Sequence, residues 1–147
     1  MLREVEPEDI SIFFEQQNDP VASAMAAFPS RDRAAHDVHW AKILADDSLI
    51  ARTIVEAGRV VGNIGSWVAD GERHVGYWIG RSYWDRGYAT RAVADFVAEV
   101  PERPLYARVA EHNVASMRVL AKCGFSVVGE EQGDGDPVKE IVMRLDA

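Results

Sequence analysis

The spacing of apolar residues changes along the chain, and each change indicates a different kind of element. Between residues 49 and 79, short apolar runs alternate with glycine-bearing connections, which predicts three strands in an antiparallel meander: Leu49 to Glu56, Val60 to Val68 and His74 to Ile79. From Ala89 to Val100 the apolar residues recur at steps of three and one, as on the buried face of a helix. The middle of the chain is therefore predicted to be a small sheet followed by an amphipathic helix.

Local signals predict the elements before the meander. Leu2 to Val5 is expected to form a short strand, and a helix should run from Pro7 to about Gln17, because proline suits a first helical turn. A second helix is predicted over Arg31 to Ala45, with Ser30 as its N-cap.

The end of the chain predicts a strand, a helix and a terminal hairpin. Asn113 can cap the helix, and Gly124 fits the left-handed position that follows a helix. The expected strands are Leu105 to Ala110, Phe125 to Gly129 and Val138 to Leu145. The predicted fold class is thus α+β, a single domain over residues 1–147 with about seven strands in a mostly antiparallel sheet and about four helices.

Composition narrows the function. The 16 basic and 24 acidic residues give a net charge of −8, and the chain has no basic run, so no nucleic-acid partner is expected. The single cysteine, Cys123, excludes an internal disulfide and a cysteine-based zinc site; we interpret it as a packing residue at a helix end. No stretch reaches the roughly 20 apolar residues of a membrane span, and the N-terminus has no apolar core of a signal peptide. We expect a soluble, cytoplasmic protein.

The stretch YWDRGYATRA carries the first candidate site. Arg86 and Gly87 form a turn between a predicted strand and the helix that follows, so the unpaired N–H groups of the first helical turn are free to bind an anion. Glycine lets the backbone approach a phosphate closely, and Arg86 adds positive charge. The chain has no G-K-[ST] and no G-x-G-x-x-G, so common nucleotide-binding fingerprints are absent, and an ordinary helix start is the alternative.

Two motifs together resemble the GNAT superfamily of acyl-CoA-dependent N-acetyltransferases. The first, Trp84-Asp85-Arg86-Gly87-Tyr88-Ala89, is similar to the signature Q/R-x-x-G-x-G/A, and its longer form YWDRGYATRA resembles the ribosomal-protein N-acetyltransferase-like branch. The second, Asn113-Val114-Ala115-Ser116 continuing as RVLAKCGF, is similar to that branch's N-x-x-S-x-x-V-L-x-K-x-G-F. With GYWI at 76–79, the resemblance covers about 60–125.

The resemblance implies a V-shaped cleft that holds acetyl-CoA as co-substrate. The pantetheine arm would pair with the backbone near Ile79 and contact Asn113. The pyrophosphate would lie on the N–H groups at the helix start, contributed by Arg86, Gly87, Tyr88, Ala89 and Thr90. No metal or redox cofactor is implied. The pair His36 and His39 lacks HExxH and a third ligand, so we interpret it as a solvated or cleft-lining face.

The implied reaction is direct attack of a primary amine on the thioester. The resemblance makes Ser116 the candidate donor to the departing thiolate, although Ser116 could simply occupy a first helical turn. The general base is open: His74 stands where many relatives carry glutamate, and Glu111 and His112 compete with it through a bridging water. For each of the three, a structural side chain is the alternative.

The acceptor amine is left open as a protein N-terminus or a small molecule. Phe28 and Trp40 are candidate linings of its pocket, and the acidic run from Glu130 to Asp136 could steer a cationic amine. The alternative function is an inactive GNAT-fold CoA-binding sensor or scaffold. Either a monomer or a homodimer is compatible with the sequence.

Overall fold

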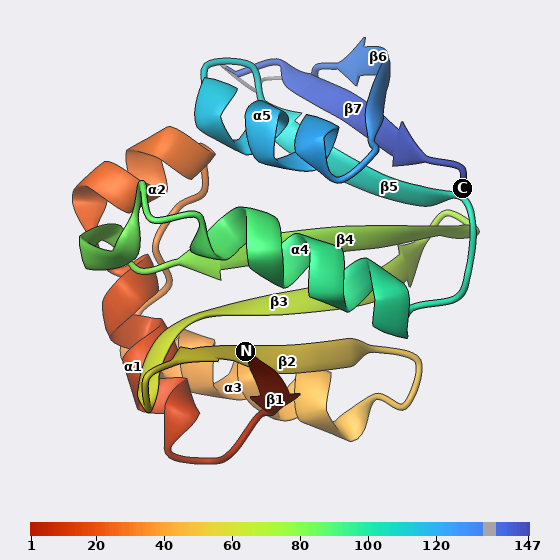
Figure 1. The fold of residues 1–147 in the computed structure, drawn as a ribbon. Coiled ribbons are helices and arrows are strands. Elements are labelled where there is room, and N and C mark those ends of the chain that lie inside the picture. Colours follow the sequence, from red (N-terminus) through yellow and green to blue (C-terminus); the bar gives the residue numbers. More distant parts are fainter. Residues whose placement is uncertain (134–137) are drawn as a thin grey trace.

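A computed structural model describes residues 1–133 and 138–147, and in it one seven-stranded sheet runs through the molecule (Figure 1). Its strand order is β1-β2-β3-β4-β5-β7-β6, and every neighbouring pair is antiparallel except β4 and β5. The strands are β1 Leu2–Glu4, β2 Ile50–Glu56, β3 Arg59–Ala69, β4 Glu72–Ile79, β5 Leu105–Ala110, β6 Ser126–Glu131 and β7 Glu140–Leu145. The predicted α+β class and seven strands are confirmed.

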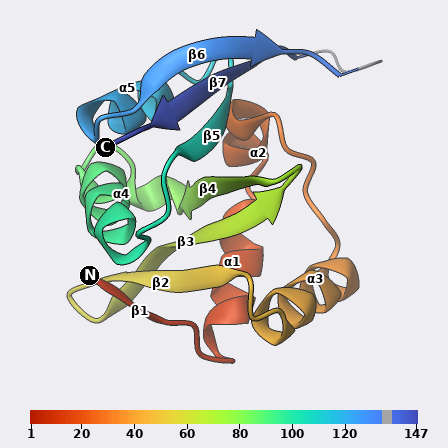
Figure 2. The same ribbon diagram turned by 90° about the vertical axis from the view of Figure 1, so that its right-hand side faces the viewer.

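Helices cover both faces of this sheet. α4 and α5 lie on one face, and α1 and α3 lie on the other (Figure 2). The described residues form five α-helices: α1 Asp9–Gln17, α2 Pro20–Ala26, α3 Arg33–Ala45, α4 Tyr88–Glu99 and α5 Val114–Lys122. A short 3-10 helix, η1, spans Arg81–Tyr83. None of the described helices has the length and apolar character needed to cross a membrane.

The helix α2 was not predicted. Its seven residues are too few to show a helical period, and its start is fixed by Asp19, whose carboxylate accepts from the backbone N–H groups of Val21 and Ala22 at 2.9 and 3.4 Å. The same carboxylate pairs with Arg81 of η1 at 3.1 Å. Asp19 followed by Pro20 is itself a local signal for a helix start, and the ion pair with Arg81 adds tertiary support to this short helix.

The start of α3 also differs from the prediction. Its N-cap is Asp32, which accepts from the N–H of Ala35 at 2.8 Å, whereas the hydroxyl of Ser30 bonds Asn18 at 2.9 Å. Serine and aspartate are both good caps, and here the hydroxyl of Ser30 bonds Asn18 and leaves the capping position to Asp32.

The parallel pair of strands separates almost at once. Only Arg73 with Leu105 and His74 with Tyr106 are paired between these two strands. Beyond them, β4 continues to Ile79 and β5 to Ala110 without pairing with each other. Because α4 follows β4 and α5 follows β5, both helices begin at the open end of this split. The split therefore leaves unpaired strand edges and two helix starts next to one another.

The N-terminal half is held together by a buried carboxylate. Asp9 is 2% exposed and accepts hydrogen bonds from both terminal nitrogens of Arg3, at 2.7 and 2.9 Å, and from the hydroxyl of Thr53 at 2.7 Å. Burial alone would raise the pKa of Asp9, but these bonds and one from the N–H of Glu6 outweigh it and lower the pKa below its usual range. One side chain thus joins β1, α1 and β2.

Replacing Asp9 with asparagine should lower the free energy of unfolding at pH 7 by about 2 kcal/mol, since a neutral amide cannot serve all these donors and Arg3 is partly screened by solvent. The folded-state pKa is below the unfolded value of about 3.9, so the carboxylate's contribution is complete above that value and is lost as the pH falls through the folded pKa. Urea unfolding of both proteins, repeated toward about pH 3, should show the difference shrinking. An unchanged difference would contradict the assignment.

Candidate functional site

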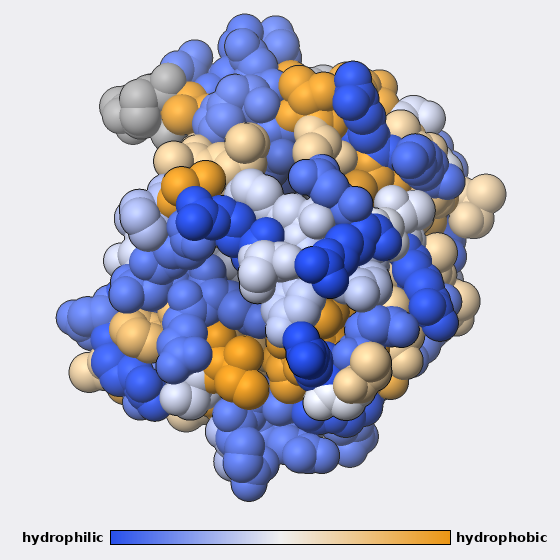
Figure 3. All heavy atoms as spheres, turned by 60° about the vertical axis from the view of Figure 1, so that its left-hand side comes forward, coloured by the Kyte–Doolittle hydropathy of each residue, from blue (hydrophilic) through white to orange (hydrophobic). Residues whose placement is uncertain are grey.

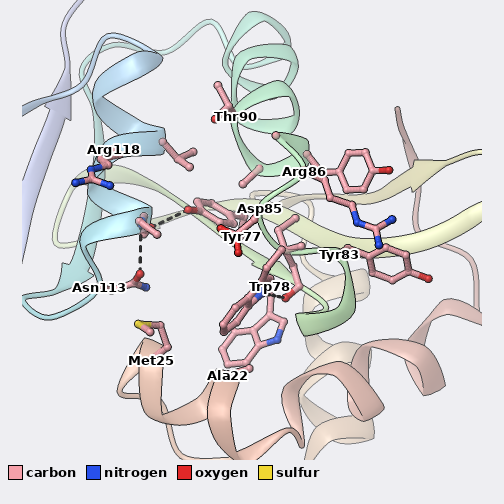
Figure 4. A pocket seen from close by; sticks show the side chains of 18 of the residues that line it. Ala22, Met25, Tyr77, Trp78, Tyr83, Asp85, Arg86, Thr90, Asn113 and Arg118 are labelled. Atoms are coloured by element: carbon pink, nitrogen blue, oxygen red, sulfur yellow. Dashed lines mark hydrogen bonds between the residues drawn. The ribbon is translucent and has the colours of Figure 1, made fainter.

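A cavity of about 630 Å³ lies at the open end of the split between β4 and β5 (Figure 4). Its walls come from four places: the end of β4, the turn and first residues of α4, the start of α5, and α2. The residues that line it include Ala22, Met25, Tyr77, Trp78, Ile79, Asp85, Arg86, Gly87, Tyr88, Ala89, Thr90, Asn113, Ser116, Arg118 and Lys122. All of the residues predicted to bind the cofactor thus line one cavity.

The first turn of α4 is open toward this cavity. Gly87 is the N-cap at φ +79°, the left-handed region that side chains other than glycine's rarely adopt, and a Cβ built there would meet no atom within 4 Å. No side chain caps this helix start among the described residues. The N–H groups of Tyr88, Ala89 and Thr90 therefore have no acceptor within the helix and line the cavity, as an anion site requires.

The turn that leads into α4 is tied to the end of β4. The indole N–H of Trp84 donates to the carbonyl of Ile79 at 2.9 Å, so this carbonyl is occupied by the protein itself. On the other side of β4, Gly62 of β3 lies so close that a Cβ would be 2.0 Å from the carbonyl oxygen of Trp78. A close strand and a fixed turn thus hold the edge of β4 that borders the cavity.

A hydroxyl pair lies on the cavity wall. The hydroxyls of Tyr77 and Ser116 are 2.8 Å apart, and both residues line the cavity (Figure 4). Burial raises the pKa of Tyr77, and the hydrogen bond with Ser116 offsets part of that shift. The side chain of Asn113 accepts from the N–H of Ser116 at 3.3 Å, which confirms the predicted helix cap.

Tyr77 was not among the predicted site residues. Strand alternation places it on the face of β4 opposite to His74, Gly76 and Trp78. What the sequence could not supply was the partner, because Ser116 is 39 residues away along the chain.

None of the three base candidates lines the cavity. His74 is 5% exposed, with its ring stacked on Trp67 at 6.0 Å and tilted against Tyr106 at 5.8 Å. Glu111 is exposed and pairs with Lys139 at 3.9 Å. His112 Nε2 lies 2.9 Å from the carbonyl of Ala24 in α2, to which it can donate. Their roles as bases stay predictions.

Charge in the cavity differs from charge over the whole chain. Arg86, Arg118 and Lys122 line the cavity with one carboxylate, Asp85, although the net charge of the protein is −8. Arg118 and Lys122, which the sequence analysis did not select, are four apart on α5 and so share a helix face. Figure 3 turns the side bearing α2 forward and shows a pale band with blue hydrophilic residues beside it and orange apolar patches above and below.

The predicted acceptor pocket is only partly supported. Phe28 is exposed and meets the cavity-lining Trp78 edge-on, with ring centroids 6.3 Å apart. Trp40, in contrast, is buried against Phe13 at 4.8 Å and belongs to the contact between α1 and α3, so its prediction was wrong.

The two histidines of α3 do not form the predicted solvated or cleft-lining face. His36 is buried edge-on against Phe14 at 5.4 Å, and burial lowers the pKa of His36 and of the half-buried His39. Within the described residues, no group of three or more histidine, cysteine, aspartate or glutamate side chains could hold a metal ion.

Cys123 and the acidic run contribute little to the described site. The thiol of Cys123 donates to the carbonyl of Thr90 at 3.4 Å, and burial raises its pKa, which agrees with a packing role. In the run from Glu130 to Asp136, residues 134–136 fall outside the described residues. Glu130 pairs with Lys139 at 3.5 Å, so its charge is partly neutralised.

The chain was compared with known families and structures. A family model described as an acetyltransferase (GNAT) domain matches residues 1–126. No curated protein matches the sequence significantly.

Solved structures share the fold at low sequence identity. A spermidine N-acetyltransferase from Vibrio cholerae, in complex with CoA and spermine, is 14% identical with a TM-score of 0.85, covering 99% of this chain and 94% of its own. A GNAT-family acetyltransferase from Bacillus anthracis is 17% identical with a TM-score of 0.83, covering 99% and 93%. An aminoglycoside acetyltransferase in complex with coenzyme A is 18% identical with a TM-score of 0.81, covering 99% and 94%.

Replacing Gly62 with alanine should destabilise the fold by about 1–3 kcal/mol, because the new methyl group would overlap the carbonyl of Trp78 and push β4 away from β3. Gly129 is the matched control: it lies on exposed β6, a Cβ there meets no atom within 4 Å, and its change to alanine should stay within about 0.5 kcal/mol. Urea unfolding measures both. Equal stabilities of the two variants would show that the close approach is not required.

Proposed function

The chain belongs to the GNAT acetyltransferase domain family, and we propose that it transfers the acetyl group of acetyl-CoA to a primary amine by direct attack on the thioester. The observation that carries the proposal is the cavity at the split between β4 and β5, where an uncapped helix start and a hydroxyl pair border one hollow. The acceptor is either a protein N-terminus, as the ribosomal-protein N-acetyltransferase-like branch would have it, or a small-molecule amine.

The cavity suits the chemistry of CoA. Its pyrophosphate would accept hydrogen bonds from the backbone N–H groups between Arg86 and Thr90 at the positive end of α4. Arg118 and Lys122 add cations from α5. The pantetheine arm would run between the separated strands and pair with β4 near Ile79, past Asn113. The structural neighbours that bind CoA, in one case together with spermine and in another with kanamycin, support this proposal.

The reaction needs a neutral amine and a stabilised thiolate. Ser116 is our candidate for the hydrogen bond to the departing sulfur, because its hydroxyl lines the cavity beside Tyr77. His74 and Glu111 stay candidates for the base. Neither of them lines the cavity. An α-amino group has a pKa near 8 and is partly neutral at pH 7, so it needs less help from a general base than the amine of lysine, whose pKa is near 10.4.

The same placement of His74 and Glu111 favours a second candidate function. A GNAT-fold protein that binds acyl-CoA without turnover, as a sensor or scaffold, would keep the uncapped first turn of α4 and would need no general base. Binding and turnover must therefore be tested separately.

Binding is tested by thermal unfolding with acetyl-CoA. At 100 times the dissociation constant a ligand adds about 2.7 kcal/mol of stability, so the wild type should unfold several degrees higher. Gly87→Glu should abolish this shift, since it adds bulk and negative charge where the phosphates would lie.

Gly71→Glu is the matched control for this experiment. Gly71 also has a positive φ, +76°, and open space around its Cβ, but it lies in the hairpin between β3 and β4, away from the cavity. Both variants suffer the same backbone strain, and only Gly71→Glu should keep the ligand shift. A shift retained by Gly87→Glu would refute the phosphate site.

Turnover is tested by thiol release from acetyl-CoA over a panel of N-terminal peptides, polyamines and aminoglycosides. We expect product with at least one amine, and Ser116→Ala should lower kcat about tenfold to a hundredfold while leaving acetyl-CoA binding unchanged. Ser126→Ala, on the exposed edge strand β6, is the control and should match the wild type. Binding without product from any amine would favour the sensor.

A further inference from the structure

Tyr77 connects the two halves of the split sheet at the cavity. It lies on β4, whereas its partner Ser116 lies on α5, which follows β5. The hydroxyl oxygens are 2.8 Å apart, and both residues line the hollow (Figure 4). A tyrosine hydroxyl that is partly buried needs a hydrogen-bond partner, and here that partner is the serine that the proposed reaction uses.

Two hydroxyls in mutual contact leave one hydrogen for a ligand. One O–H is used in the bond between them, and the other is free to point elsewhere. Either hydroxyl can be the donor in this bond. The phenol is the more acidic group and therefore the better donor, which favours the arrangement in which Tyr77 donates to Ser116 Oγ. In that arrangement the hydrogen of Ser116 is free for a ligand in the cavity. The bond from the N–H of Ser116 to Asn113 fixes the backbone from which this hydroxyl projects.

We propose that Tyr77 is a positioning residue for the departure of the thiolate: it donates to Ser116 Oγ and so directs the Ser116 hydroxyl at the sulfur of CoA. The inference rests on the proposed function, because it needs CoA in this cavity. It adds a residue to the site that neither sequence motif singled out for this reaction.

The step balances without proton loss from the pair. The amine nitrogen bonds to the thioester carbon, the C–S bond breaks, and its electron pair goes to the sulfur. A thiol with a pKa near 8.5 is more acidic than Tyr77, whose pKa burial raises above its usual value near 10. Tyr77 and Ser116 therefore keep their protons and stabilise the thiolate by hydrogen bonding, and the proton of the amine leaves to solvent.

The experiment titrates the thiol of bound CoA through the ultraviolet absorbance of its thiolate. The same protein carrying desulfo-CoA is subtracted, which removes the signal of tyrosine ionisation. In the wild type the pKa of the bound thiol should lie below that of free CoA. Tyr77→Phe and Ser116→Ala should each raise it by about one pH unit, as expected on losing a hydrogen bond to a charged group.

The double variant gives the sharper result. If Tyr77 acts through Ser116, the double variant should resemble either single variant, because the second change removes nothing further. Tyr106→Phe is the matched control, since Tyr106 lies on β5 outside the cavity wall, and it should leave the thiol pKa unchanged.

Three results would overturn the inference. The first is a Tyr77→Phe complex with the wild-type thiol pKa while Ser116→Ala raises it. The second is strictly additive shifts in the double variant. The third is a wild type that acetylates an amine but does not lower the thiol pKa, which would leave the proposed function intact. Failure of the wild type to bind CoA would instead refute both proposals.

Discussion

The early separation of β4 and β5 is the constraint on which the rest of the structure depends. Two in-register pairs join the strands, and beyond His74 and Tyr106 their facing edges part. Backbone groups inside a protein need partners, so a separation of this kind persists only where something else can bind to the exposed edges or water can reach them. The cavity, the open start of α4 and the start of α5 all lie at this position, because each helix follows the end of one of the two strands.

The distribution of charge explains why an acidic protein can carry an anion site. The net charge of −8 is a sum over the whole chain, whereas binding depends on charged groups within a Debye length of about 8–10 Å of the ligand. Around the cavity, three cationic side chains and a helix N-terminus outweigh one carboxylate. The absence of a nucleic-acid partner, expected from composition, stays a prediction, and composition says nothing about this local excess of positive charge.

Much of the fold was predictable because it depends on local chemistry. Residues close together in the sequence are enough to predict the seven strands, the amphipathic helix α4, the Asn113 cap and the left-handed Gly124 after α5. α2 was not predicted although Asp19 and Pro20 form a local start signal, because its seven residues show no helical period and the ion pair with Arg81 forms only in the folded chain. The burial of His36 and Trp40 depends on the packing of α3 against α1, and residues near them in the sequence do not determine that packing.

The candidate site likewise has one part that the sequence predicts and one part that only the folded structure reveals. Residues 86–90, at the start of α4, are consecutive, so a sequence motif reveals them, and all of them line the cavity. The contact between Tyr77 and Ser116 joins residues 39 apart on different elements and appears only when the sheet is assembled.

The helix α2 is fixed at both of its ends by contacts with residues that follow β4 and β5. Asp19 at its start is paired with Arg81, on the β4 side of the split, and the carbonyl of Ala24 lies 2.9 Å from His112, on the β5 side. The seven-residue helix thus bridges the two halves and forms one wall of the cavity with Ala22 and Met25. Under the proposed function, substitutions on that wall would change the shape presented to the acceptor and leave the first turn of α4 unchanged. Acceptor preference would then change in evolution, or by design, independently of the part of the chain that would hold the acyl donor.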